Sequence, residues 1–253
     1  MKLDDLSYKY VENEPFISGL SQEVPEGQIL SIIGPNGAGK STLLQLMSGQ
    51  RQPDSGKVVL NGQSLADLSL KQRAQKIAVV QQQNQVYDRM TVSDVVKTGR
   101  AAYHSLLATI PDSEISEFLK TADLTDLADK QITELSGGQQ QRVWIAAALA
   151  QEPDYLMLDE PTTYLDVHFQ KEIMDLIKQL QREKQITVIM VIHNINTAFK
   201  VSDQIWMMKA GKLVKTGTSS ELEDERLLSE LFASEMRIVD VPDYGKYVVD
   251  INR

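Results

Sequence analysis

The sequence predicts an α/β protein with a mostly parallel sheet as its core, an antiparallel β lobe and an inserted α-helical subdomain. Four short apolar runs are each followed by loop or helix signals, as expected for parallel strands buried on both faces. The runs are residues 29–33, 77–80, 155–158 and 186–192. With 253 residues, of which 42% are hydrophobic, the chain can bury the core of one large domain or of one domain with an inserted lobe.

The antiparallel lobe is predicted from the first sixty residues. Residues 3–10 and 17–24 have the pattern of half-exposed strands, and residues 57–60 lead into Asn61-Gly62, a strong hairpin-turn signal. Near the end of the chain, residues 237–241 and 246–250 flank Pro242-Asp243-Tyr244-Gly245. This turn sequence predicts a second hairpin.

The helical subdomain is predicted from residues 91–129, where the apolar pattern becomes helical. Thr91-Val92-Ser93-Asp94 and Pro111-Asp112-Ser113-Glu114 both resemble helix starts. Further helices are expected over residues 138–150, 167–184 and 194–201.

The composition of the chain indicates which partners it can bind and in which compartment it works. The net charge of −9 argues against a broad nucleic-acid surface, which requires a basic face. The chain has no cysteine, which fits a reducing compartment, and its start has no apolar stretch of signal-peptide length. The apolar stretches are far shorter than the roughly 20 residues that span a bilayer, so we expect any membrane role to act through a partner. The acidic run at residues 221–225 is expected to be a solvated helix end.

A phosphate-binding loop follows the first buried strand. Its nine residues match the pattern GxxxxGK[ST] and are Gly34, Pro35, Asn36, Gly37, Ala38, Gly39, Lys40, Ser41 and Thr42. Glycine-rich backbone N–H groups and the positive end of the following helix bind phosphate oxygens in such loops. We therefore expect Lys40 to reach the β- and γ-phosphates of a nucleoside triphosphate, Ser41 to ligate Mg²⁺ and Thr42 to contact phosphate.

Two carboxylates end a later apolar strand, at Asp159 and Glu160. A strand end in a sheet that also carries a phosphate loop is the expected place for a Mg²⁺ ligand. We expect Asp159 to hold the Mg²⁺ shell and Glu160 to polarise the attacking water.

A second glycine-rich helix start, Leu135-Ser136-Gly137-Gly138-Gln139, lies upstream of these carboxylates. The phosphate loop, LSGGQ and LMLDEP in this order resemble the nucleotide-binding subunit of an ABC transporter. The resemblance covers essentially the whole chain and implies a RecA-like P-loop NTPase fold. It implies one ABC ATPase domain over residues 1–253, with a core at 1–82 and 153–235, the helical subdomain at 83–152 and a terminal hairpin at 236–253.

The resemblance assigns roles to further residues. Tyr10 matches the aromatic residue that stacks on adenine, with Tyr8 as the alternative. Gln82 matches the Q-loop glutamine, which touches Mg²⁺ or the attacking water. The family often has Pro before that glutamine, whereas this chain has Gln81, and the adjacent Gln83 leaves the register defined to within one residue.

His193 ends the last apolar strand and matches the histidine that hydrogen-bonds the γ-phosphate. It is followed by Asn194 where the family frequently has Asp. Leu165-Asp166 matches the D-loop, which crosses the dimer interface in this family. His104 belongs to no motif, and we expect it at the surface.

The family also implies cofactors and partners. ATP and Mg²⁺ are expected at a composite site, with Ser136 and the Gly138 amide closing over ATP held by a second copy of the chain. Integral membrane permease subunits, and indirectly an extracytoplasmic substrate-binding protein, are the expected partners, and no nucleic acid is. The expected location is peripheral, on the cytoplasmic face of the cell membrane.

The segment DEPTTYLD, residues 159–166, resembles importers of ferric siderophores, with haem and cobalamin importers as near relatives. The resemblance thus implies an ATP-hydrolysing subunit that energises a permease for an iron chelate. Import of haem or cobalamin is the alternative. A soluble ABC ATPase with a mechanical or assembly role is a further alternative, and a small-molecule P-loop kinase fits less well because it has no LSGGQ.

Overall fold

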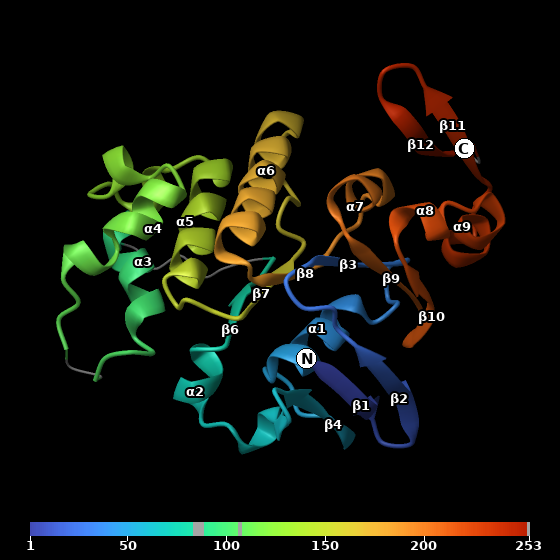
Figure 1. The fold of residues 1–253 in the computed structure, drawn as a ribbon, viewed down its shortest axis with the longest axis horizontal. Helices are drawn as coiled ribbons and strands as arrows, with labels where there is room; N and C mark the ends of the chain where they lie inside the picture. Colours follow the sequence, from blue (N-terminus) through green and yellow to red (C-terminus); the bar gives the residue numbers. More distant parts are fainter. Residues whose placement is uncertain (83–88, 106–107, 252–253) are drawn as a thin grey trace. The chain divides into compact units, whose positions relative to one another are not determined.

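A computed structural model describes residues 1–82, 89–105 and 108–251, and its chain divides into two compact units (Figure 1). One unit contains Met1–Ala66 and Ile189–Arg253, and the other contains Asp67–Val188. Both units mix helices with strands, and parallel strand pairs occur in each. The predicted α/β class with parallel strands is therefore confirmed.

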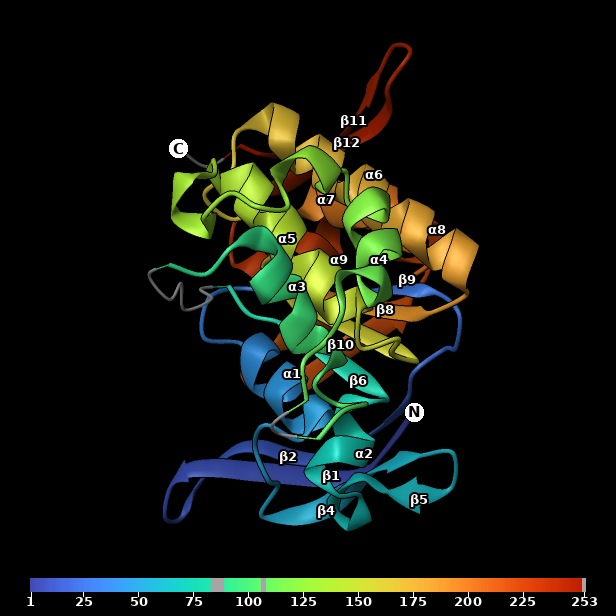
Figure 2. The same cartoon turned by 90° about the vertical axis from the view of Figure 1, so that its left-hand side faces the viewer.

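The first unit contains the antiparallel sheet predicted from the first sixty residues. Its strands lie in the order β2-β1-β4-β5, and the long strands β1 and β2 run side by side in Figure 2. The bounds are β1 Lys2–Val11, β2 Glu14–Glu23, β4 Ser55–Leu60 and β5 Gln63–Ser64. Asn61 and Gly62 join β4 to β5 with φ of 49° and 82°, the positive values that a tight hairpin turn requires.

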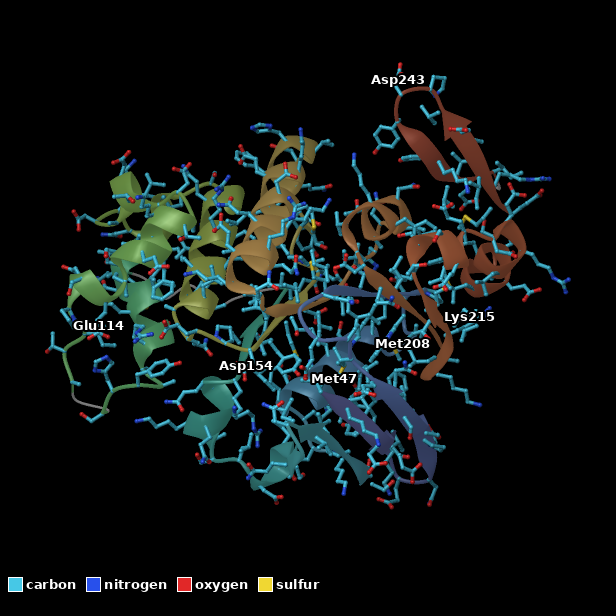
Figure 3. All side chains as sticks on the ribbon, viewed as in Figure 1. Met47, Glu114, Asp154, Met208, Lys215 and Asp243 are labelled. Atoms are coloured by element: carbon cyan, nitrogen blue, oxygen red, sulfur yellow. The ribbon has the colours of Figure 1, made fainter. Side chains whose placement is uncertain are left out.

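The same unit contains a parallel pair that leads into the phosphate loop. Strand β3 (Ile29–Ile33) pairs in parallel with β9 (Gln204–Lys209), and β10 (Lys212–Gly217) continues antiparallel from β9. All of β3 is buried, as expected for a parallel strand. Met47 of α1 (Lys40–Ser48) and Met208 of β9, both labelled in Figure 3, are 0% exposed and belong to this core.

The end of the chain forms short helices and a hairpin. The elements are α7 Ile195–Val201, α8 Ser219–Leu222, α9 Glu225–Phe232, β11 Met236–Val241 and β12 Gly245–Asp250. Strands β11 and β12 pair antiparallel around the predicted turn, where Asp243 is labelled in Figure 3. The acidic run spans the end of α8 and the start of α9, where Asp224 caps α9.

The second unit contains a parallel pair and a group of helices. Strand β6 (Ile77–Val80) pairs in parallel with β7 (Tyr155–Asp159), while β8 (Thr187–Val191) spans the boundary between the units. Helix α5 (Gly137–Leu149) packs against three others, as Figure 1 shows in green and yellow. These are α3 Val92–Arg100, α4 Ser116–Thr121 and α6 Val167–Lys184. Short turns of helix complete the unit: α2 Leu70–Ala74, η2 Asp112–Glu114, η3 Thr125–Leu127 and η4 Ile132–Glu134.

Close packing of α3 on α5 depends on Gly99. A Cβ atom at Gly99 would lie 2.0 Å from the carbonyl oxygen of Ala147, so a larger residue would force the two helices apart. Helix α3 begins where it was predicted to begin. Thr91 and Asp94 form a capping box there, in which the side chain of each accepts a hydrogen bond from the backbone N–H of the other. The β lobe and the group of helices are thus as expected. The exact boundaries between core, helical subdomain and terminal hairpin, at residues 82/83, 152/153 and 235/236, stay a prediction.

In the described ranges, no helix combines the length and the apolar character needed to cross a bilayer.

Candidate phosphate-binding and catalytic site

The phosphate loop connects β3 to α1. Helix α1 begins at Lys40 after Gly39, which has φ of 98° and is followed by a first turn that has neither a side-chain cap nor an acidic residue. Helix starts normally satisfy their N–H groups with a side chain such as Ser or Asp. The start of α1 is therefore suited to receive an external anion instead.

Two glycines allow the loop to approach its surroundings closely. A Cβ at Gly34 would lie 2.0 Å from the Met208 carbonyl oxygen, and a Cβ at Gly39 would lie 3.2 Å from Phe16 Cε1. Gly37, with φ of 76°, has open space around it. The loop is thus packed on the unit at its ends and open at Gly37, so a polyphosphate fits these residues.

Lys40 is curled over this loop. Its ammonium group donates hydrogen bonds to the carbonyl oxygens of Gly34 (2.9 Å) and Pro35 (3.0 Å), and the residue is only 5% exposed. A buried ammonium requires such acceptors. The cation is consequently held at the loop, where phosphate oxygens of a ligand would be.

Tyr10 lies beside the same loop. Its hydroxyl oxygen and the Thr42 Oγ1 are 2.7 Å apart in a hydrogen bond, and Tyr10 is 54% exposed. The ring of Phe16 meets it edge-on at 5.1 Å between centroids. The first unit therefore brings together Lys40, Thr42 and an exposed aromatic ring.

The two predicted carboxylates lie at the end of β7 in the second unit. Asp159 is the last residue of the strand and is half-buried. Glu160 has φ of 52°, an uncommon value for a side chain with a Cβ, and such strain is typical of functional positions.

Hydrogen bonds from two side chains orient Glu160. The side-chain amide of Gln82 donates to Glu160 Oε2 at 2.6 Å, and the Thr163 hydroxyl donates to the same oxygen at 3.1 Å. Gln82 and Glu160 were expected from their motifs. Thr163 was not, although its position three residues after the acid was a usable signal. Gln83, the alternative in the Q-loop register, lies outside the described residues.

The LSGGQ helix start has a different construction from α1. Ser136 caps α5, since its hydroxyl accepts from the Gln139 N–H at 3.4 Å and its own N–H donates to Gln139 Oε1 at 3.1 Å. Gly138 is buried, because a Cβ there would lie 2.6 Å from Phe169 Cδ1. Ser136 and Gly137 are exposed, so they form the accessible part of this helix start.

The D-loop follows in the same unit. Asp166 is exposed and caps α6 by accepting from the Phe169 N–H at 3.1 Å. On either side of it, Tyr164 and Val167 are 81% and 83% exposed. Large side chains this exposed are suited to contact another molecule.

His193 follows the buried strand β8 after one further buried residue, Ile192, and is itself exposed. Asn194 caps α7 through a hydrogen bond from the Thr197 N–H to its Oδ1, at 3.0 Å. Asn and Asp are both good N-cap residues, so the Asn in place of a common Asp preserves the local structure.

His104 is partly exposed and also has a partner. Its Nε2 lies 2.8 Å from Glu114 Oε2, and its side chain is only 24% exposed. The hydrogen bond with His104, together with the charge of Arg100, lowers the pKa of Glu114. This cluster links α3 to η2 and is structural.

The sequence profile of the family described as ABC transporter matches residues 17–163, more than half of the chain. The chain belongs to the ABC transporter family. The match includes the phosphate loop, Gln82, the LSGGQ helix start and both carboxylates. The protein is thus an ABC ATPase, which binds and hydrolyses ATP.

The sequence similarity to other ABC ATPases extends over most of the chain. It is 41% identical over 213 residues to the petrobactin import ATP-binding protein YclP of Bacillus subtilis, covering 84% of each chain. It is 38% identical to the iron(3+)-hydroxamate import ATP-binding protein FhuC of Bacillus subtilis, covering 92% of this chain and 87% of that protein. It is also 38% identical to the phosphonates import ATP-binding protein PhnC of Wolinella succinogenes, covering 93% and 89%.

Among solved structures, a metal-chelate type ABC transporter in an inward-facing conformation has a similar fold. The TM-score is 0.87 at 26% identity, covering 99% of this chain and 96% of that chain. The predicted P-loop fold with its β lobe and helical subdomain is confirmed by this likeness together with the family match.

Proposed function

We propose that this ABC ATPase powers a membrane permease that imports an iron chelate, a ferric siderophore. The observation that carries the hydrolytic part is the hydrogen bond from Gln82 to Glu160, at 2.6 Å. It joins two residues 78 positions apart in the chain and fixes a carboxylate that the family uses as general base.

ATP binding is assigned to the loop of residues 34–42 and to Tyr10. The start of α1 and the Lys40 ammonium stabilise the phosphates, while the Tyr10 ring stacks on adenine. Ser41, Gln82 and Asp159 would hold Mg²⁺, which neutralises developing charge on the phosphates. Oxygen ligands of this kind suit Mg²⁺.

Hydrolysis is assigned to Glu160 and His193. Glu160 orients the attacking water and takes its proton, and the contacts from Gln82 and Thr163 hold its carboxylate in one orientation. His193 donates a hydrogen bond to the γ-phosphate. A positioned base and a positioned donor reduce the reorganisation needed at the transition state.

A second copy of the chain completes the site. Ser136, the Gly138 N–H and Asp166 act across the interface on ATP held by the partner, as the family resemblance implies. The exposed Ser136 and Gly137, with Tyr164 and Val167 beside Asp166, support an interface at these residues. ATP between two copies stabilises the closed dimer, and hydrolysis releases it.

The motion of the dimer is transmitted to permease subunits, on the cytoplasmic face of the membrane, and an extracytoplasmic binding protein delivers the cargo. The siderophore assignment is supported by the names of YclP and FhuC and by the DEPTTYLD segment. PhnC supports a second candidate cargo, a phosphonate.

Cells that lack this chain should fail to accumulate radiolabelled iron from ferric siderophores under iron limitation. Because the permease cannot cycle without ATP hydrolysis, a plasmid-borne wild-type copy should restore uptake and a Lys40→Ala copy should not. Uptake is measured in parallel for ferric hydroxamates, petrobactin, haem, cobalamin and a phosphonate.

An exposed-residue variant, Lys171→Ala on α6, should restore uptake fully. Normal siderophore uptake with a lost phosphonate, haem or cobalamin signal would reassign the cargo. Normal uptake of every compound would contradict the import function.

A further inference from the structure

An aromatic cluster lies on β1 next to the phosphate helix. Tyr8 and Tyr10 are two residues apart on β1 and therefore lie on the same face of the strand. Their rings are nearly perpendicular, with 5.0 Å between centroids. Phe16 of β2 meets Tyr10 at 5.1 Å. Perpendicular contacts of this kind are a favourable arrangement of aromatic rings and fix the ring planes.

Arg51, which belongs to none of the motifs, covers this cluster. Its guanidinium carbon lies 5.1 Å from the centroid of the Tyr8 ring and 5.0 Å from that of the Tyr10 ring. Both distances are within the range of cation–π attraction. One cation therefore stabilises the positions of two rings.

The same guanidinium makes directional hydrogen bonds. Its Nη1 donates to the Tyr8 hydroxyl, and its Nε donates to the Gln45 side-chain carbonyl oxygen at 3.1 Å. Gln45 belongs to α1, the helix that also carries Lys40, Ser41 and Thr42. Arg51 thus ties the aromatic rings of β1 to the helix that begins at the phosphate loop.

These contacts determine how Tyr10 is presented. Its hydroxyl is hydrogen-bonded to Thr42, the rings of Tyr8 and Phe16 pack nearly perpendicular to its ring, and the Arg51 guanidinium lies over the ring. The residue is nevertheless 54% exposed, so part of the ring remains accessible to a planar ligand. A ring fixed in this way loses little conformational entropy when a base stacks on it.

We propose that Arg51 is a positioning residue of the purine-binding site. It holds Tyr8 and Tyr10 at a set place relative to α1, so that a base stacks on Tyr10 while its triphosphate occupies residues 34–42. The proposal rests on the nucleotide site proposed above and adds a residue that acts on the base and not on the phosphates.

Arg51→Gln should raise the Kd for ATP by about 3- to 10-fold, as expected for the loss of cation–π contacts to two rings. The Kd for inorganic tripolyphosphate with Mg²⁺, which has no base, should stay at the parental value. In steady-state assays the KM for ATP should rise with little change in kcat. Isothermal titration calorimetry measures both Kd values on the full chain.

Tyr8→Phe keeps the ring and removes the hydroxyl acceptor, so it should weaken ATP binding in the same direction and by less than Arg51→Gln. Arg51→Lys keeps the charge but lacks the planar guanidinium that spans Tyr8 and Gln45. Its Kd for ATP should therefore lie between those of the parent and Arg51→Gln. Arg226→Gln, on the exposed face of α9, is the matched control and should bind ATP normally.

Parental ATP affinity in Arg51→Gln would overturn the proposal. So would equal losses of ATP and tripolyphosphate binding, which indicate a damaged fold. Neither result would affect the proposed function if Lys40→Ala still loses most of its affinity for ATP. ATP binding by Lys40→Ala at parental affinity would instead contradict the proposed nucleotide site itself.

Discussion

Glu160→Gln should slow ATP hydrolysis by about 10² to 10⁴, the usual cost of removing a positioned general base. The amide has nearly the shape of the carboxylate and can still meet Gln82 and Thr163, but it cannot take a proton from water. ATP binding should therefore be preserved. Single-turnover hydrolysis of radiolabelled ATP measures the rate.

The same variant should accumulate the ATP-bound dimer, since the step that separates the two copies is blocked. With ATP it should elute as a dimer on a sizing column, and with ADP as a monomer. Glu183→Gln, an exposed acid near the end of α6, should behave like the parent. Parental hydrolysis by Glu160→Gln would show that another group is the base.

Lys40→Ala should lose most of the affinity for ATP. Hydrogen bonds to charged groups are worth about 1.5 to 3 kcal/mol, which corresponds to a Kd higher by about 10- to 150-fold. Lys40 also satisfies the carbonyl oxygens of Gly34 and Pro35, so a thermal melt must accompany the binding measurement. The loss should appear for tripolyphosphate as well, because Lys40 acts on phosphate.

Ser136→Arg provides the contrast that tests the dimer. Its monomer should bind ATP with parental affinity, whereas ATP should no longer produce a dimer in the Glu160→Gln background. Since Ser136 also caps α5, Ser136→Ala controls for the lost cap, which costs about 1 kcal/mol. Equal loss of monomer affinity in Ser136→Arg and Lys40→Ala would contradict an action in trans.

The buried parallel strands could be predicted closely from the sequence. Strands β3 and β6 have the expected bounds because a strand covered on both faces is a continuous apolar run. Helix α6 also has its expected bounds, since Asp166 caps its start and its apolar residues recur at helical spacing.

Other elements were missed for physical reasons. Strand β9 contains the run Ile205-Trp206-Met207-Met208, a usable signal that was not assigned, whereas none of the residues of β10 is buried, so the strand offers little pattern. Helices α2, α8 and α9 are short and depend on their caps rather than on a long apolar face. The predicted strand at residues 186–192 is shorter, at Thr187–Val191.

In the candidate site, local motifs could be recognised from the sequence, whereas contacts between distant residues could not. Motifs named Lys40, Gln82, Glu160 and His193 because each follows a strand with a recognisable pattern. The contact between Gln82 and Glu160 depends on the parallel pairing of β6 with β7, which no local pattern specifies. Arg51 could not be found from sequence, because an isolated arginine after a helix carries no signal of what it covers.

If this chain is the ATPase of a membrane importer, it should be recovered from membranes together with a permease. The tagged wild-type chain, expressed with its chromosomal neighbours, is captured from detergent-solubilised membranes, and the proteins that elute with it are identified by mass spectrometry. We expect a permease with many membrane-spanning segments in near-stoichiometric amount, and adding this permease to the purified chain should raise its rate of ATP hydrolysis. A chain that remains in the soluble fraction without any membrane protein would contradict it.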